Sequence, residues 1–196
     1  GWPDSAALWK AQVAHFAGRY RSVVVDFPSF GSDRASTGAD FFELADRLAE
    51  KLRRVATPRP PRIVIVAHDW GAYLAYHFER RHPQWVDALV TLDVGALVVP
   101  TGFAHAAFLV SYQWWLVAAW LVGHVLPPVG TAMSRAFARF ARAPRAERTT
   151  WRINYWYAYF WRARLSSKYG DRVLRKYRPS KPLLFLYGRG KRFHFH

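Results

Sequence analysis

A run of β-branched residues that passes directly into a helical pattern is the feature that most constrains the fold. The stretch "IVIVAHDWGAYLAY", residues 63–76, begins as a buried strand and continues as a helix without a linker. Small residues at Ala67 and Gly71 would allow a tight turn, so the side chain of Asp69 would stand at the carboxyl end of the strand. The following helix N-terminus favours negative charge at that point. The pattern therefore predicts either a nucleophilic carboxylate or a helix-capping Asp without chemistry.

Buried strands and amphipathic helices alternate along the first half of the chain. Strands are expected at 20–27, 63–67 and 86–94, a helix should begin at Asp4 or Ser5, and further helices should cover 39–56 and 71–82. Nearly all-apolar strands separated by helices are typical of a parallel sheet covered by helices on both faces. The predicted class is therefore α/β, with a mostly parallel, doubly wound sheet.

This alternation stops after Gly95 and resumes near the end of the sequence. The intervening residues are aromatic, rich in Arg and compatible with helices, whereas "KPLLFLYG" at 181–188 is again a buried-strand pattern. We therefore expect a core at 1–96, an inserted helical segment at 97–180 and a resumed core at 181–196. Because the sequence lacks an initiator Met and ends one strand after the core resumes, we expect a fragment that is truncated at both ends.

Positive charge is concentrated in the second half of the chain. The net charge is +16, and residues 94–196 contain 17 Lys and Arg but only two Asp and Glu. These basic residues are interleaved with large aromatics and match no nucleic-acid-binding motif, so no nucleic-acid partner is expected. The absence of cysteine excludes disulfides and thiolate metal sites. No signal peptide is recognised, which favours a cytoplasmic over a secreted protein without fixing the location.

One long segment carries no charge. Residues 94–134 contain no Asp, Glu, Lys or Arg, and 106–126 are long enough to span a bilayer. Ser111, Gln113 and His124, together with aromatics in the middle rather than at the ends, disfavour a span. A buried or interfacial helix is therefore predicted, with peripheral membrane association as an alternative.

The order of four motifs resembles the α/β-hydrolase superfamily, and within it the epoxide hydrolase and haloalkane dehalogenase branch. The segments that carry the resemblance are "GWPDS", "VVVDFPSFGSD", "HDWGA" and "HPQWVDALVTLD". The resemblance implies the α/β-hydrolase fold with a helical cap, and it implies that Asp69 is the nucleophile where esterases have Ser. It also implies that the backbone N–H groups of Trp2 and Trp70 form the oxyanion hole.

The remaining members of a catalytic triad are harder to place. The loop in which many relatives carry the acid reads "GRGKRF" here, and no acid follows Asp171. A dehalogenase subgroup has the acid after the strand that follows the nucleophile helix, which points to Asp93, although a strand-end Asp that accepts turn N–H groups is the alternative. The family's catalytic His would lie beyond this chain, so none is assigned. His194 and His196 have no carboxylate nearby, so no metal is expected, and no cofactor either.

Two cap tyrosines hydrogen-bond the epoxide oxygen in the epoxide hydrolase branch. The resemblance implies Tyr112, in "SYQWW", as the first, and either Tyr155 or Tyr157, in "INYWYAYF", as the second. An aromatic core stripe is the alternative for all three.

The resulting hypothesis is an epoxide-hydrolase-like enzyme. Asp69 would form an ester with a small apolar epoxide, and water would release a diol. One alternative is a haloalkane dehalogenase in which the Trp70 indole binds halide. Another is an incomplete, non-catalytic hydrolase-fold protein that associates with membranes through 106–126. The sequence fixes neither the substrate nor the oligomeric state.

Overall fold

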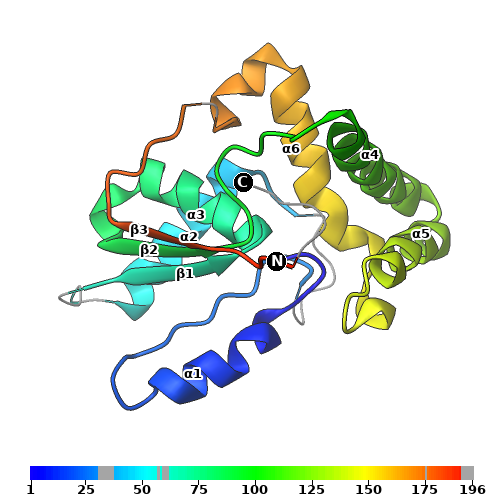
Figure 1. Ribbon diagram of the computed structural model, residues 1–196. Coiled ribbons are helices and arrows are strands. Elements are labelled where there is room, and N and C mark those ends of the chain that lie inside the picture. Colours follow the sequence, from blue (N-terminus) through cyan, green and yellow to red (C-terminus); the bar gives the residue numbers. More distant parts are fainter. Residues whose placement is uncertain (31–37, 57, 59–61, 175, 191–196) are drawn as a thin grey trace. The chain divides into compact units, whose positions relative to one another are not determined.

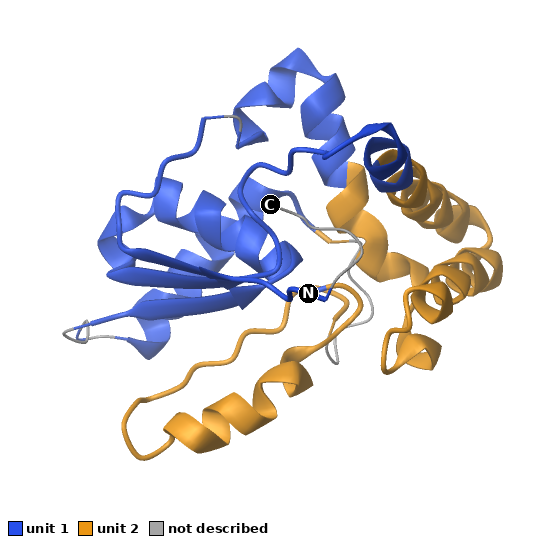
Figure 2. Cartoon of the chain, in the orientation of Figure 1, with its two compact units in different colours: residues 1, 39–109, 159–196 blue, residues 2–38, 110–158 orange. Residues whose placement is uncertain are grey.

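The computed structural model describes residues 1–30, 38–56, 58, 62–174 and 176–190. These residues form two compact units (Figure 2). Unit 1 contains residues 1, 39–109 and 159–196, and unit 2 contains residues 2–38 and 110–158. The three-part division into 1–96, 97–180 and 181–196 remains a prediction, because the two units are defined by contacts rather than by chain order.

A three-stranded parallel sheet forms the centre of unit 1 (Figure 1). Its strands are β1 (Val64–His68), β2 (Ala88–Leu92) and β3 (Leu183–Leu186), in the order β1-β2-β3. Val66 pairs with Val90, and Leu92 pairs with Leu186. The α/β class and the parallel sheet expected from the sequence are confirmed.

Helices α2 (Phe41–Val55) and α3 (Trp70–Arg81) pack beside this sheet in unit 1. Helix α3 packs against β1 and β2, and α2 packs against α3. Asp40 begins α2 by accepting hydrogen bonds from the N–H groups of Phe42 and Glu43, a regular N-cap. The opposite sheet face is exposed at Val64 and Val66. The described residues of unit 1 therefore do not supply the second helical layer that a doubly wound sheet requires.

Glu79 on α3 holds the segment that leads into β3 through hydrogen bonds. Its carboxylate accepts hydrogen bonds from the Tyr177 hydroxyl at 3.0 Å and from the Ser180 N–H at 2.9 Å. The Glu79 residue is only 2% exposed, and burial together with this carboxylate raises the pKa of Tyr177 above its usual value. These bonds fix the entry of the chain into its third strand.

The N-terminal part of unit 2 differs from one sequence prediction. The chain begins with the 3₁₀ turn η1 (Ala6–Trp9) and α1 (Lys10–Phe16), after a cap at Ser5, as expected. The predicted strand at 20–27 is wrong, because these residues form no regular element. Val23 and Val24 are exposed, and the described part of unit 2 has no strand whose backbone groups could pair with theirs.

Helices make up the rest of the chain between β2 and β3. They are α4 (Phe103–Val125), α5 (Pro127–Phe140) and α6 (Tyr155–Leu165), with the 3₁₀ turns η3 (Ala146–Arg148), η4 (Trp151–Asn154) and η5 (Ser167–Arg172). A further 3₁₀ turn, η2 (Pro83–Trp85), lies between α3 and β2. Within unit 2, α4 and α5 approach so closely that a Cβ on Gly130 would lie 2.6 Å from the Gly123 Cα. Glycine at these positions therefore sets the spacing of the two helices.

His77 lies completely inside unit 1. Its ring stacks on Phe41 at 5.2 Å, and neither ring nitrogen has a hydrogen-bond partner in the described residues. Burial, assisted by the nearby charges of Arg80 and Arg81, lowers the pKa of His77 from 6.5 to about 3. The imidazole is therefore neutral in the folded protein at every pH above that value.

This buried imidazole should make the protein sensitive to mild acid. Below pH 6.5 the unfolded chain binds a proton at residue 77 that the folded chain does not, so stability falls with pH from about 6.5 toward 3, with a cost of about 2 kcal/mol at pH 5. His77→Phe should remove this part of the pH dependence, measured as the free energy of unfolding in urea at pH 7.5 and pH 5. The exposed control His15→Phe should leave the dependence unchanged. If the free energy of unfolding fell by the same amount between pH 7.5 and pH 5 in His77→Phe and in wild type, the lowered pKa of His77 would be contradicted.

Candidate functional site

Asp69 occupies a strained corner between β1 and α3. Its backbone has φ 55° and ψ −126°, a conformation that is unfavourable for a residue with a side chain. Its carbonyl accepts the first helical hydrogen bonds from Ala72 and Tyr73, but its carboxylate does not cap the helix. The capping interpretation of Asp69 therefore has no support in the geometry, and the side chain stands at the carboxyl edge of the sheet.

Gly1 lies directly against this carboxylate. A Cβ on Gly1 would be 2.5 Å from the Asp69 Cβ and 2.8 Å from its Oδ2. A Cβ on Gly71 would meet nothing within 4 Å. The expectation that Gly71 provides room for the turn is therefore wrong, because Gly71 is an ordinary helical position. The glycine that the corner requires is Gly1.

Asp93 follows β2 and connects the ends of all three strands. Its Oδ2 lies 3.1 Å from the His68 Nε2, and its Oδ1 accepts a 3.4 Å hydrogen bond from the N–H of Gly188. Its own N–H donates to the Leu186 carbonyl, and its φ is 70°. Both carboxylate oxygens thus have partners inside unit 1, as in the turn-capping alternative, and the role of Asp93 as a triad acid remains a prediction.

Trp70, the first residue of α3, is packed inside unit 1. Its ring lies 5.9 Å from Phe41 and 5.7 Å from both Tyr73 and Phe160. Only 8% of the residue is exposed. Its predicted roles, a backbone oxyanion donor or an indole that binds halide, are compatible with a rigid position at the helix N-terminus but are not tested by it.

Trp2 is held by the helical part of unit 2. Its indole N–H donates a 2.9 Å hydrogen bond to the Asn154 Oδ1, and the Asn154 amide donates to the Ser134 hydroxyl. Ser134 in turn donates to the Gly130 carbonyl. Since Ser134 and Asn154 are fully buried, this chain of hydrogen bonds fixes the Trp2 side chain firmly.

Tyr112 and Tyr157 meet in an aromatic cluster of unit 2. Their ring centroids are 6.0 Å apart and nearly perpendicular. Phe137 stacks on Tyr112 at 5.2 Å, and Trp2 lies 5.6 Å from Phe137 and 6.2 Å from Tyr157. We call these four rings, Trp2, Tyr112, Phe137 and Tyr157, the aromatic cluster. It joins residues that the sequence analysis singled out from three separate segments.

The Tyr155 ring does not belong to the aromatic cluster. Its ring lies 5.0 Å from Trp156 and 6.3 Å from Phe30, and the residue is completely buried. Of the two late tyrosines, the structure therefore pairs Tyr157 with Tyr112 and places Tyr155 in the core of unit 2.

The candidate residues fall into two groups. Asp69, Trp70 and Asp93 belong to unit 1, whereas the tyrosines and Trp2 belong to unit 2. Sequence reasoning missed two polar partners, His68 and Asn154. His68 could have been found, because it ends a strand beside the strand that Asp93 follows. Asn154 carries no sequence signal that connects it to Trp2.

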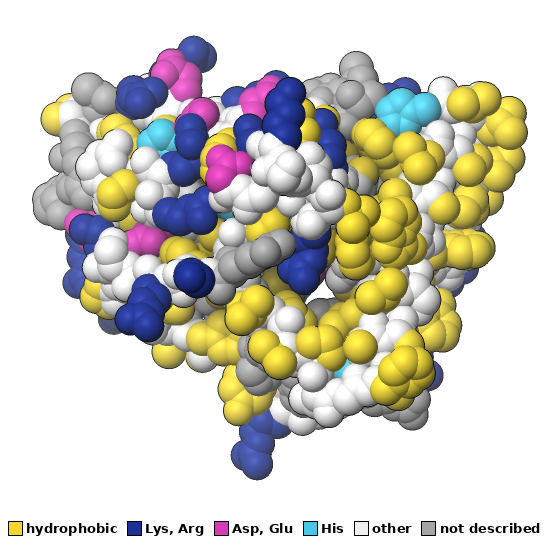
Figure 3. Space-filling view, turned by 90° about the horizontal axis from the view of Figure 1, so that it is seen from above, with side chains coloured by type: hydrophobic (Ala, Val, Ile, Leu, Met, Phe, Trp, Pro, Cys, Tyr) yellow, Lys and Arg dark blue, Asp and Glu magenta, His cyan; other side chains and the backbone are white. Residues whose placement is uncertain are grey.

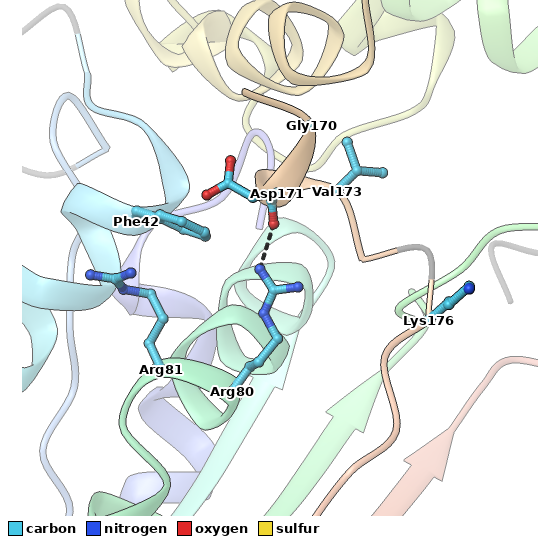
Figure 4. Close-up of a pocket in the computed structure, with 7 residues that line it drawn as sticks. All are labelled: Phe42, Arg80, Arg81, Gly170, Asp171, Val173 and Lys176. Atoms are coloured by element: carbon cyan, nitrogen blue, oxygen red, sulfur yellow. Dashed lines mark hydrogen bonds between the residues drawn. The ribbon is translucent and has the colours of Figure 1, made fainter. Parts of the chain in front are cut away.

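The pocket in Figure 4 contains none of these residues. It lies in unit 1 and is lined by Phe42, Arg80, Arg81, Gly170, Asp171, Val173 and Lys176. The Arg80 guanidinium donates to the Asp171 carbonyl, and the Arg81 guanidinium is paired with Asp46. The described residues also contain no group of three His, Cys, Asp or Glu side chains that could hold a metal ion.

Comparison with known proteins identifies related sequences. The profile of a family described as "Alpha/beta hydrolase family" matches residues 1–191. Epoxide hydrolase 3 of Xenopus tropicalis is 29% identical over 93 residues, which cover 47% of this chain and 25% of that protein. A haloalkane dehalogenase of Sphingobium indicum is 30% identical over 112 residues, which cover 53% of this chain and 36% of that protein. The matched region thus spans only about a quarter to a third of these relatives.

Solved structures share the fold. A candidate epoxide hydrolase from Pseudomonas aeruginosa superposes with a TM-score of 0.67 at 22% identity, covering 97% of this chain and 70% of that chain. The epoxide hydrolase CorEH superposes with a TM-score of 0.66 at 16% identity, covering 96% of this chain and 72% of that chain.

The contrast between Gly1 and Gly71 gives a test of the corner geometry. Gly1→Ala should lower the free energy of unfolding by about 1–3 kcal/mol, because the new methyl group must displace Asp69. Gly71→Ala should instead be neutral or stabilising by up to about 1 kcal/mol, since Ala is the better helix former and the space is open. Urea denaturation of both variants measures the difference. A Gly1→Ala variant as stable as wild type would refute the close contact.

Proposed function

Since this chain belongs to the α/β-hydrolase family, we propose that it is an epoxide-hydrolase-like enzyme in which Asp69 attacks an apolar epoxide. One observation carries the proposal: Asp69 has a left-handed backbone at the carboxyl edge of a parallel sheet, with a carboxylate that does not serve as a helix cap. Ligands of open α/β sheets bind at this edge, and strain at a polar residue there is typical of functional sites.

The first chemical step would form an ester. A carboxylate oxygen of Asp69 attacks one epoxide carbon, the C–O bond of the ring breaks, and the oxygen leaves as an alkoxide that needs a proton. The phenols of Tyr112 and Tyr157 suit this task, because each can donate a hydrogen bond or a proton as the ring opens. Their rings lie side by side in the aromatic cluster. The apolar surroundings of that cluster favour a small hydrophobic substrate.

The second step would release a diol. Water attacks the ester carbonyl, and the backbone N–H groups of Trp2 and Trp70 are proposed to stabilise the oxyanion. The bond between the carbonyl carbon and the substrate oxygen then breaks, which releases the diol and restores the Asp69 carboxylate. The attacking water requires a general base, and we assign none in this chain. Asp93 is the proposed orienting acid for such a base.

Haloalkane dehalogenation is the second candidate. It is favoured by the position of Asp93 after β2 and by the similarity to a haloalkane dehalogenase of Sphingobium indicum. In that reaction the Asp69 carboxylate would displace halide from carbon, and the Trp70 indole would bind the leaving ion. The pairing of Tyr112 with Tyr157 favours the epoxide instead.

Asp69 is the residue on which both reactions depend. In the full-length protein, Asp69→Ala should abolish diol formation from an apolar aryl epoxide and halide release from a haloalkane, whereas the exposed control Glu50→Gln should retain full activity. Diol and halide assays on the wild-type protein separate the two candidates. If Asp69→Ala turned over either substrate at the wild-type rate, the nucleophile assignment would fail. A wild-type protein without either activity would favour a non-catalytic role.

The two late tyrosines provide a matched pair for the oxygen-binding role. Tyr157→Phe and Tyr112→Phe should each lower kcat for the epoxide by about 10²-fold or more, because each removes a proton donor and leaves its ring in place. Tyr155→Phe removes the same atom from the core of unit 2 and should leave kcat unchanged. The reverse order of effects, with Tyr155→Phe inactive and Tyr157→Phe active, would disprove the pairing.

A further inference from the structure

The surface formed by α4 and α5 in unit 2 is unusually apolar. Figure 3 shows hydrophobic side chains gathered over the side of the molecule that these helices form. Its large exposed members, which we call the α4–α5 apolar surface, are Val110, Trp114, Leu121, Val125, Val129 and Phe140. Contiguous apolar patches of this kind on a protein surface mark a binding partner.

These residues lie on one face of α4 and continue onto α5. Val110, Trp114, Leu121 and Val125 are separated by four, seven and four positions, the spacing of a single helical stripe. The Trp115 indole N–H donates to the Met133 carbonyl, so the two helices are held together and their exposed side chains form one surface. The surface is therefore continuous rather than a set of scattered residues.

The opposite face of α4 is already used for packing within the protein. Leu116 and Ala119 are completely buried, and Gly123 lies against the Trp151 ring. By length and composition α4 could cross a membrane. A helix with one packed face and one exposed apolar face fits a position in the plane of a membrane interface better than a span across it.

The positive charge beside this surface indicates which kind of partner binds it. The exposed cations Arg139, Arg142, Arg145 and Arg148 follow one another at the end of α5 and in the next turn, and Phe140 lies among them. Residues 110–158 contain six Arg and one acidic residue, Glu147. A second copy of a chain with a net charge of +16 would bring like charges together, whereas anionic lipid headgroups would neutralise them.

We propose that unit 2 docks on an anionic lipid bilayer through the α4–α5 apolar surface, with the four arginines contacting the headgroups. Trp114 and Phe140 are the aromatic anchors, since amphipathic rings are favoured at the level of the headgroups. Val110, Leu121, Val125 and Val129 would enter the outermost part of the acyl layer. This docking does not depend on the proposed enzymatic activity.

Flotation with lipid vesicles tests the docking in the full-length protein. Wild type should bind vesicles of 70% phosphatidylcholine and 30% phosphatidylserine, bind pure phosphatidylcholine at least about tenfold more weakly, and lose affinity as salt is raised. Leu121→Ser/Val125→Ser should weaken binding at least about tenfold, because two membrane-facing side chains become polar. Leu165→Ser changes a leucine of unit 1 that is also more than half exposed; it is the control and should bind as wild type does.

A second variant separates charge from apolar contact. Arg139→Gln/Arg142→Gln should lower binding to the anionic vesicles and abolish most of its salt dependence, with circular dichroism confirming that each variant remains folded. Wild-type protein that fails to bind anionic vesicles would overturn the proposal, as would full binding by Leu121→Ser/Val125→Ser. If sedimentation showed a dimer in the absence of lipid that this double variant dissociates, a second copy would be the occupant instead.

Discussion

Parallel pairing of the three strands is the constraint on which the candidate chemistry of unit 1 depends. The residue after each of the first two strands is bonded to its neighbour: the Asp69 N–H donates to Leu92, and the Asp93 N–H donates to Leu186. Both aspartates have positive φ, which costs about 1–3 kcal/mol each. Such conformations persist only where the surroundings over-determine them. The ladder, extended by one bond beyond each strand, provides that constraint and keeps two carboxylates at the same edge of the sheet.

The sequence predicts the fold best where several local signals agree. Residues 63–94 contain two apolar strands, a helical pattern and a His-Pro break, and the structure forms β1, α3 and β2 there. The strand expected at 20–27 had the same apolar signal but does not form. Hydrophobic periodicity indicates that a segment can be buried in a sheet. A strand also needs an adjacent strand whose backbone groups can form hydrogen bonds with its own. That neighbour is a property of the tertiary structure, which no local pattern contains.

The candidate site shows the same division. The position of Asp69 at the corner was predictable because its strand, its turn and its helix are consecutive in the sequence. Space at the corner was expected from small residues at Ala67 and Gly71, but the close approach to Asp69 is made by Gly1 from a distant segment. The contact between Tyr112 and Tyr157, and the exclusion of Tyr155 from it, depend on helix rotation by 200° over two residues, which resemblance alone does not resolve. A residue on consecutive elements can therefore be placed from the sequence, whereas contacts between distant segments, such as that of Trp2 with Asn154, cannot.

The hydrogen bond from Trp2 to Asn154 limits how far the predicted insertion at 97–180 can be treated as an exchangeable module. It joins residues 152 positions apart, and its acceptor is held by Ser134 on another helix. Exchange of the insertion for a foreign one, as in building a chimaera, would remove the anchor of the second residue of the chain. Variation in the insertion and variation at the N-terminal loop should therefore be coupled during evolution. An exchange of specificity between relatives would have to transfer both segments together.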